Sequence, residues 1–409
     1  MQLGFESPRG RHFQNAGRST GVFHAQAPPP SQPPPPPSMD TALFDYELPA
    51  DRIAATPAAR RDESRLLVVE RDTGTVSHHI FRELPDLLPA GTTLFRNRAR
   101  VLPARLHGLR PTGGAVECLL LRPAEPDGAA WWCLLRPGAK TAAAGTFALA
   151  GTYSASVEEK RDSEYRVRFA TPDGRPIAAV AEEIGSLPLP PYIERARAAG
   201  TGDDDAERSR QFAALDRQRY QTVYADPART VAAAAPTAGL HFTPELLAEL
   251  ERRGFAFRDL VLHVGLGTFQ PVKTGRVEEH PIHTERYELS AAAVDGILRG
   301  RKRLAVGTTA LRAMEDFARK HAAGTAKPSP ADGAFAGDAS LFIVPPAVFG
   351  GADFLLTNFH LPRSTLMCLV AAFLDPAGTA GIARLKALYA EAIAANYRFY
   401  SYGDAMLIL

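Results

Sequence analysis

The sequence predicts a mixed α/β fold, in which a main α/β domain carries a smaller inserted all-β barrel domain. Strand and helix patterns alternate from Val231 onward, as they do in wound α/β sheets. Between residues 102 and 187 the pattern changes to short strands separated by turn sequences, which is typical of a small antiparallel barrel. The chain of 409 residues is long enough for two domains and a large core.

Residues 1–38 differ from the rest of the chain in composition. They contain proline runs at 28–30 and 33–37 and few large apolar side chains, so they cannot offset the entropy lost on ordering. We therefore predict a disordered, proline-rich tail, and no apolar core of a secretion signal is present in it. The predicted main domain comprises residues 39–101 and 188–409, and the barrel domain comprises residues 102–187.

The first part of the main domain and the barrel are expected to consist mostly of strands. A helix is expected only at 84–88. The expected strands are 65–69, 75–80, 91–95, 101–106, 116–121, 131–135, 146–149 and 165–169. Turn sequences such as Pro126-Asp127-Gly128 separate the later ones. A proline-stiffened extended segment at 187–192 is expected to close the insert.

The second half of the chain is expected to form the wound sheet and its helices. The expected helices are 206–220, 244–253, 291–299, 309–321, 364–374 and 382–396. The expected strands are 260–264, 303–306, 341–344 and 354–356. Thr243 is expected to cap the helix at 244–253, with Pro244 in its first turn. In such a sheet the active loops lie at the carboxyl ends of the strands.

Composition excludes several classes of protein. No apolar run approaches the length of a membrane span. Cys118, Cys133 and Cys368 form no Cys-x-x-Cys pair, which argues against zinc, iron–sulfur and disulfide frameworks and favours a reducing, cytoplasmic location. The net charge of +2 indicates no polycation, so any nucleic-acid partner would be bound through a local basic face.

Residues 236–285 hold the densest group of reactive side chains. His241 and His263 each follow an apolar residue beside a glycine-rich loop, where a binding site is favoured over a buried structural role. Glu279, His280, His283 and Glu285 resemble a metal cluster in composition. However, Pro281 disfavours a helical ligand pair, so we expect proton transfer between carboxylate and imidazole and no metal.

A glycine-rich loop follows the strand expected at 260–264. Gly265, Gly267 and Thr268 could present backbone amides to a carboxylate or to ribose oxygens, although a simple tight turn remains an alternative. A dinucleotide fingerprint is excluded because its third glycine is absent and Pro271 stands where the helix should begin.

Three later segments complete the candidate site. Thr308 and Thr309 open a helix after a glycine turn, which favours an anion that Arg312 could reinforce; a plain threonine cap is equally compatible. Asn358 and His360 suit contacts with adenine or a base edge. The remaining candidates are Arg363, for a phosphate, and Asp404, within an aromatic and arginine-rich stretch that could stack on RNA bases or simply pack in the core.

Ordered motifs along the chain match a known family. They include Phe44-Asp45-Tyr46-Glu47-Leu48-Pro49 and Thr357-Asn358-Phe359-His360-Leu361-Pro362. The complete set occupies residues 44–49, 61–66, 103–106, 188–193, 220–225, 236–285, 305–309, 357–362, 397–399 and 401–406. The chain thereby resembles the S-adenosylmethionine:tRNA ribosyltransferase-isomerases of queuosine biosynthesis.

The resemblance implies a mixed α/β domain with an inserted barrel, and a reaction. The ribosyl part of S-adenosylmethionine would be transferred and isomerised onto 7-aminomethyl-7-deazaguanine at the wobble position of tRNA with a GUN anticodon. Epoxyqueuosine-tRNA, adenine and methionine would be the products of a monomeric, cytoplasmic, metal-free enzyme. The chemistry needs a base beside the sulfonium, which we expect to be His241, His263 or His283, oriented by Glu279 and Glu285.

Some residues depart from the family pattern. Residues 345–351 are less polar and basic than usual, Arg363 replaces a usual lysine, and Leu266 replaces a smaller residue. Two alternatives therefore stay open. The chain could be a divergent homologue that donates the ribosyl group of S-adenosylmethionine to another acceptor, or a non-catalytic RNA-binding module.

Overall fold

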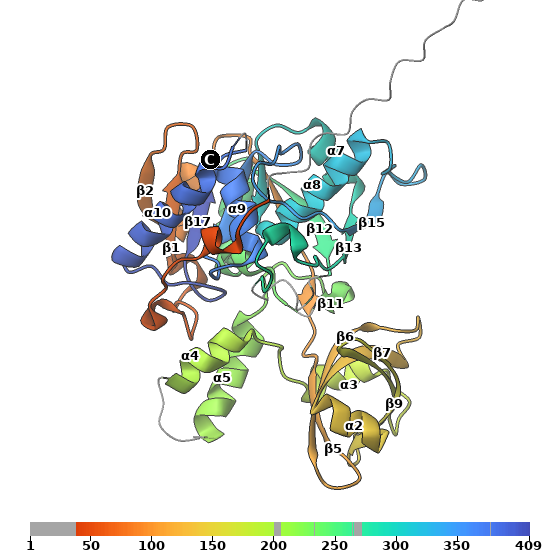
Figure 1. Ribbon diagram of the computed structural model, residues 1–409. Helices are drawn as coiled ribbons and strands as arrows, with labels where there is room; N and C mark the ends of the chain where they lie inside the picture. The colour runs from red at the N-terminus through yellow and green to blue at the C-terminus, as the bar shows by residue number, and fades with distance from the viewer. Residues whose placement is uncertain (1–37, 200–205, 233, 264, 266–271, 377) are drawn as a thin grey trace, which may run out of the picture. The chain divides into compact units, whose positions relative to one another are not determined.

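The computed structural model describes residues 38–199, 206–232, 234–263, 265, 272–376 and 378–409. The chain from Ser38 onward forms one compact unit (Figure 1). The predicted proline-rich tail up to Pro37 and the predicted site residues Gly267 and Thr268 lie outside the described residues. Within the described ranges, no helix has both the length and the apolar composition needed to cross a membrane.

A nine-stranded mixed sheet, here called the main sheet, has the strand order β15-β13-β12-β3-β14-β16-β17-β1-β2. Its strands are β1 (Arg65–Val69), β2 (Val76–Ile80), β3 (Thr93–Asn97), β12 (Ala256–Leu262), β13 (Glu285–Leu289), β14 (Arg303–Val306), β15 (Phe335–Ala339), β16 (Phe354–Asn358) and β17 (Ala405–Ile408). The pairs β12–β3, β3–β14 and β14–β16 are parallel, whereas β13 is antiparallel to β12 and β17 is antiparallel to β16.

These strand directions bring the chemistry-bearing segments to one edge of the main sheet. The carboxyl ends of β12, β14 and β16 meet there with the amino ends of β13, β17 and β1. His263, Gly307 and Asn358 follow or end the parallel strands, and Glu285 begins β13. The topology therefore places the loops that are predicted to be active at this edge of the main sheet.

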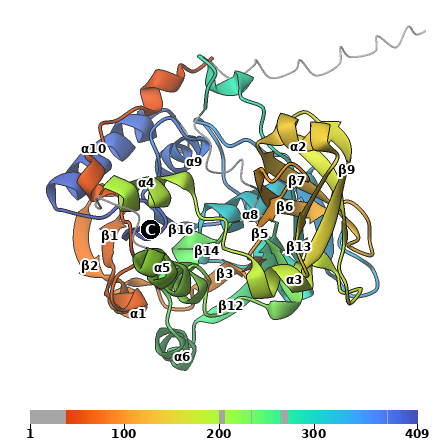
Figure 2. The ribbon, with the colours of Figure 1, turned by 90° about the horizontal axis from the view of Figure 1, so that it is seen from below.

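Helices cover both faces of the main sheet because alternate strand residues point to opposite sides. Leu67 and Val69 belong to one core, and Leu66 and Val68 belong to the other. Figure 2 shows α9 and α10 on one side of β1 and β16, and α6 on the other. The covering helices are α1 (Leu84–Leu87), α6 (Pro244–Arg252), α7 (Ala291–Arg299), α8 (Thr308–Ala322), α9 (Thr365–Leu374) and α10 (Ala380–Ala394).

Local sequence signals start these helices where expected. The Thr243 hydroxyl accepts from the Leu246 amide at 3.1 Å, and Pro244 occupies the first turn of α6, as predicted. Ser364 caps α9 in the same way. Residues 367–374 of α9 are buried on all sides, which explains why this helix is continuously apolar.

Six strands form a closed antiparallel barrel in the order β10-β7-β6-β5-β8-β9. They are β5 (Arg105–Leu109), β6 (Ala115–Pro123), β7 (Ala130–Arg136), β8 (Thr146–Leu149), β9 (Tyr153–Arg161) and β10 (Glu164–Ala170). The helices α2 (Gly138–Ala144) and α3 (Ile177–Ile184) accompany them. A separate core around Cys133, Phe147 and Val167 fills the barrel. The predicted fold class, a mixed α/β protein with an all-β barrel, is confirmed.

Several expected elements differ from the structure. The prediction of a strand at 341–344 is wrong, because the strand in this region is β15 at Phe335–Ala339. The Leu341 carbonyl accepts a hydrogen bond from the side chain of Arg312, and not from a neighbouring strand. The extended exit expected at 187–192 gives way at Pro191 to helix α4 (Pro191–Ala199). Proline suits this first helical position because it needs no amide partner there.

The remaining elements are short or peripheral. Helix α5 is Ala206–Arg219, and β4 (Arg100–Val101) pairs in parallel with β11 (Thr230–Ala232). Single 3-10 turns are Thr41–Phe44, Ala50–Arg52, Arg61–Glu63, Phe81–Glu83, Pro227–Arg229, Thr237–His241 and Val277–Glu279.

Candidate active site

Two adjoining hollows lie at the edge of the main sheet where the parallel strands end. The first hollow is lined by His280, Ile282, His283, Glu285, Thr308, Thr309, Arg312, Leu341, Phe342, Ile343, Thr365, Leu366 and Leu369. The second hollow is lined by Tyr192, Ala235, Thr237, Ala238, Gly307, Thr308, Thr309, Thr357, Asn358, Phe359, His360, Leu361, Leu366, Tyr400 and Ser401. They share Thr308, Thr309 and Leu366, so one extended ligand can contact both.

The amino end of α8 forms the wall shared by the two hollows. Gly307 precedes it with φ of +94°, a conformation that glycine adopts without strain, and no side chain in the described part of the chain caps the helix. The Thr309 hydroxyl is buried and has no hydrogen-bond partner among the described residues. A helix amino end carries partial positive charge and free amides, so this wall suits a carboxylate or another anion.

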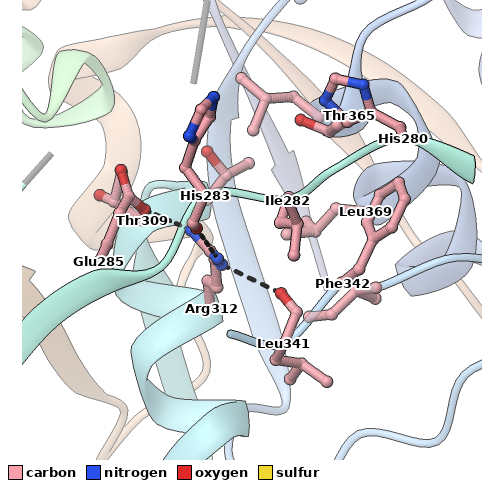
Figure 3. Close-up of a pocket in the computed structure, with 13 residues that line it drawn as sticks. His280, Ile282, His283, Glu285, Thr309, Arg312, Leu341, Phe342, Thr365 and Leu369 are labelled. Atoms are coloured by element: carbon pink, nitrogen blue, oxygen red, sulfur yellow. Dashed lines mark hydrogen bonds and ion pairs between the residues drawn. The ribbon is translucent and has the colours of Figure 1, made fainter. Parts of the chain in front are cut away.

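Arg312 holds the first hollow together (Figure 3). Its guanidinium group pairs with Glu285 and donates to the carbonyls of Leu341 at 3.0 Å, His283 at 2.8 Å and Ala339 at 2.9 Å. The Glu285 carboxylate also accepts from the Gly265 amide at 2.9 Å. Arg312 therefore fixes the floor of the hollow, and most of its donors are engaged by the protein itself.

Two histidines face the first hollow from the segment before β13. Neither ring nitrogen of His283 has a hydrogen-bond partner among the described residues, and its side chain is exposed. The His280 ring lies 6.3 Å from that of Phe342 between centroids, and burial together with nearby His283 lowers the pKa of His280. The opposite wall is apolar. His283 is therefore placed to exchange a proton with a ligand.

His241 is held in a buried polar network behind the second hollow. Its Nδ1 lies 2.7 Å from the Ser64 hydroxyl and its Nε2 lies 3.2 Å from the Asn358 amide nitrogen. The ring also stacks at a tilt against Phe81, with centroids 5.0 Å apart. Burial, and then the positive charges of Arg398 and Arg61, lower the pKa of His241 to about 3. The imidazole is therefore neutral and positioned by its neighbours.

His360 is also neutral and engaged. Its Nε2 lies 2.7 Å from the Thr357 hydroxyl, and its amide donates to the Tyr389 hydroxyl at 2.9 Å. Burial lowers the pKa of His360 to about 3. Its carbonyl accepts from Tyr46 at 2.5 Å, which ties the N-terminal segment to this loop.

These two buried imidazoles predict loss of stability in acid. Each has a pKa of about 3 in the folded protein, below the ordinary histidine value of 6.5, so the unfolded state binds more protons between those limits. Stability is therefore fully present above pH 6.5 and falls as the pH drops toward 3, by about 1.4 kcal/mol per pH unit for each imidazole.

Chemical denaturation at a series of pH values measures this slope. Replacing His360 by glutamine is expected to reduce the slope by about one proton. The matched control is His107→Gln, which changes an exposed side chain on the barrel strand β5 and should leave the slope as in wild type. Equal slopes for all three proteins would contradict the expectation.

Six of the predicted site residues that the structure describes line neither hollow. Two of them, His241 and Gly265, contact residues that do, namely Asn358 and Glu285. The other four are His263, Glu279, Arg363 and Asp404. His263 lies against Glu288 at 4.0 Å, with its pKa lowered by burial, and Glu288 lies on the opposite face of β13 from Glu285. Glu279 is exposed on a 3-10 turn. Arg363 pairs with Asp45 through its guanidinium group.

Asp404 also lies outside both hollows, and its position indicates a structural role. It is buried, and its carboxylate accepts from the backbone amides of Arg65 at 3.0 Å and Arg398 at 2.8 Å. These contacts join the start of β1 to the loop before β17. No ligand group is needed to satisfy this carboxylate.

The structure adds residues that the sequence patterns did not single out. Tyr192, Thr237, Tyr400 and Ser401 line the second hollow, and the Tyr192 hydroxyl lies 2.5 Å from that of Ser401. Thr237 could have been found from its position four residues before His241, whereas the others come from distant segments. In the described part of the chain, no group of three or more His, Cys, Asp or Glu side chains is arranged to hold a metal ion.

Comparison with known proteins gives the family. Residues 41–408 match the model of a family described as queuosine biosynthesis protein. The S-adenosylmethionine:tRNA ribosyltransferase-isomerase of Pelobacter propionicus is 43% identical over 370 residues, covering 89% of this chain and 98% of that protein. The protein of the same name from Heliobacterium modesticaldum is 44% identical over 377 residues, covering 91% and 100%.

A solved structure is also similar in sequence. The crystal structure of S-adenosylmethionine tRNA ribosyltransferase from Thermotoga maritima is 32% identical and covers 90% of this chain and all of that one, with a TM-score of 0.46. The family match and the two near-full-length relatives do not depend on that superposition. By these matches, the chain belongs to the queuosine biosynthesis protein family.

Proposed function

We propose that the protein is an S-adenosylmethionine:tRNA ribosyltransferase-isomerase. It transfers and isomerises the ribosyl part of S-adenosylmethionine onto 7-aminomethyl-7-deazaguanine at the wobble position of tRNA with a GUN anticodon. The products are epoxyqueuosine-tRNA, adenine and methionine, and the enzyme works as a cytoplasmic monomer without a metal. The observation that carries this proposal is the near-full-length identity with relatives of that name.

The first hollow suits the methionine part of the ribosyl donor. The uncapped amino end of α8 and the unpartnered Thr309 hydroxyl complement a carboxylate. The apolar side chains of Phe342 and Leu369 suit the methylene and methyl groups around sulfur. The Glu285 carboxylate, held by Arg312, lies where it can offset the positive charge of the sulfonium.

We assign the proton-transfer step to His283. The carbon beside the sulfonium must lose a proton, and a neutral imidazole with an accessible nitrogen can accept it. His283 lines the first hollow with an unengaged ring, whereas both ring nitrogens of His241 are engaged and His263 lines neither hollow. The second hollow, with Tyr192 and Tyr400 in its wall, suits the departing adenine.

The test is incubation of the protein with S-adenosylmethionine and tRNA that carries the deazaguanine precursor, followed by mass analysis of the nucleosides. Adenine release together with epoxyqueuosine supports the proposal. Adenine release without that nucleoside indicates another acceptor, the alternative that the atypical sequence of residues 345–351 leaves open. Binding of tRNA without turnover would indicate an RNA-binding module.

His283→Gln is expected to lower the rate of adenine release by about 100-fold, the smaller end of the effect of general acid–base catalysis. Folding should persist because the side chain is exposed. His107→Gln, in the barrel, is the matched control and should turn over at the wild-type rate. A wild-type rate for His283→Gln would remove this residue from the mechanism.

A further inference from the structure

A chain of buried hydrogen bonds runs behind the second hollow. The Ser64 hydroxyl lies 3.1 Å from the Arg61 carbonyl and 2.7 Å from His241 Nδ1. Asn358 Nδ2 lies 3.2 Å from His241 Nε2, and Thr237 Oγ1 lies 3.0 Å from Asn358 Oδ1. We call this set, from the Arg61 carbonyl to the Thr237 hydroxyl, the relay.

The direction of each hydrogen bond follows from the Arg61 end of the relay. A carbonyl can only accept, so the single Ser64 proton is used on it. Ser64 must then accept from His241, which places the imidazole proton on Nδ1. The other ring nitrogen of this neutral imidazole is therefore an acceptor.

The same logic carries through to Thr237. Because His241 Nε2 is an acceptor, the group of Asn358 that faces it must be the amide nitrogen, which donates one proton to it. The second proton of that nitrogen is donated to the Tyr400 carbonyl at 3.3 Å. The Asn358 oxygen then accepts the Thr237 proton. Thr237 has no other proton to give, so its oxygen offers only lone pairs to the second hollow that it lines.

Burial keeps the relay in this one arrangement. Ser64, His241 and Asn358 are exposed by only 2%, 4% and 3%, so water cannot readily replace their partners. Reversing one bond would leave a buried donor facing a donor elsewhere along the relay, which is costly. The low pKa of His241, about 3, keeps a second proton off its ring at neutral pH.

We infer that the relay makes the Thr237 hydroxyl a hydrogen-bond acceptor in the second hollow, where it receives an N–H group of bound S-adenosylmethionine. This inference rests on the proposed function for the identity of the ligand. The N–H donors of that ligand are the exocyclic amine of adenine and the ammonium group of methionine. Ser64 and His241 act on the ligand through Asn358 and Thr237, and they are therefore positioning residues.

The relay is tested in the free protein by nitrogen-15 NMR of labelled histidine. The expected signals of His241 are those of a neutral ring protonated on Nδ1 from pH 5 to 8. Ser64→Ala removes the acceptor and should shift the ring toward the other tautomer, while Ser64→Thr keeps the hydroxyl and should restore the wild-type signals. A ring protonated on Nε2 in the wild-type protein overturns the relay.

The ligand contact is tested by calorimetric binding of S-adenosylmethionine, its 6-oxo analogue and its analogue without the α-amino group. One analogue is expected to bind the wild-type protein about tenfold more weakly, the loss typical of one hydrogen bond. That difference should disappear in Thr237→Val and return in Thr237→Ser. The analogue that shows it identifies the N–H donor.

Thr141→Val is the matched control, because it removes a buried hydroxyl that donates to the Pro137 carbonyl in the barrel. Unequal binding that persists in Thr237→Val overturns the contact. Absence of S-adenosylmethionine binding overturns it together with the proposed function. A His241 ring protonated on Nε2 in a protein that still binds S-adenosylmethionine overturns the relay alone. Failure of the relay is therefore distinguishable from failure of the proposed function.

Discussion

Replacing Arg312 with leucine is expected to destabilise the protein by about 3–5 kcal/mol, the usual cost of removing one partner from a buried ion pair. The Arg312 and Glu285 side chains are exposed by only 12% and 5%. The substitution also frees the carbonyls of His283, Ala339 and Leu341 from the guanidinium group. Both the stability and the shape of the first hollow should therefore suffer.

Denaturant titration measures the stability, and the rate of adenine release measures the effect on the site. The matched control is Arg303→Leu, because Arg303 is also exposed by 12% and clamps Asp353 and two carbonyls at the opposite end of β14. That variant should lose stability without changing the affinity for S-adenosylmethionine.

A double replacement separates charge burial from function. Changing Glu285 to leucine as well should recover part of the lost stability, because no uncompensated carboxylate remains buried. Activity should stay low, since Glu285 lines the first hollow. Near-wild-type stability of Arg312→Leu alone would show that the pair contributes little to the fold.

Glu315→Ala is expected to cost about 3 kcal/mol or more, because three amides lose their acceptor in one step. The fully buried Glu315 carboxylate on α8 accepts from Gly350 at 2.9 Å, Gly351 at 2.7 Å and Ala352 at 3.0 Å. A side chain on Gly351 would meet the Met314 carbonyl at 2.8 Å, so the loop approaches α8 closely. Glu315 thus anchors the atypical loop at 345–351.

Hydrogen exchange of these three amides measures the local effect, and denaturation measures the global one. Glu315→Gln should lose less stability than Glu315→Ala. The new side-chain nitrogen would face a backbone amide donor, but the side-chain oxygen would still accept. The control is Glu391→Ala, which removes a carboxylate that is exposed by 43% and paired with His78; a loss of about 0–1 kcal/mol is expected there. Unchanged exchange in Glu315→Ala would contradict the anchor.

The barrel and the order of the later helices could be predicted because their signals are local. Turn sequences divide the barrel strands, and caps such as Thr243 mark helix starts. Strand β9 was missed because its outer half, to Arg161, is polar on both faces and shows no alternation. Helix α2 was missed because it begins at Gly138, within the dipeptide Pro137-Gly138 that indicates a turn.

The candidate site residues could be grouped from the sequence, but their contacts could not. Sequence proximity grouped His263 with Glu285, but the alternation of β13 puts Glu288, and not Glu285, beside His263. The Ser64 partner of His241 is 177 positions away, and no local pattern reveals such a pair. Residues were thus found by type and neighbourhood, whereas their partners depend on the assembled sheet.

The place of β17 in the main sheet has a consequence for synthesis. Strand β17 lies between β16 and β1, and it connects the pair β1–β2 to the other strands of the main sheet. β1 is made early, yet it cannot join the other strands until residues 405–408 leave the ribosome. The apolar residues of β1 therefore lack their β17 neighbours until that distant segment has been made, and pairing over such a long sequence separation favours slow folding.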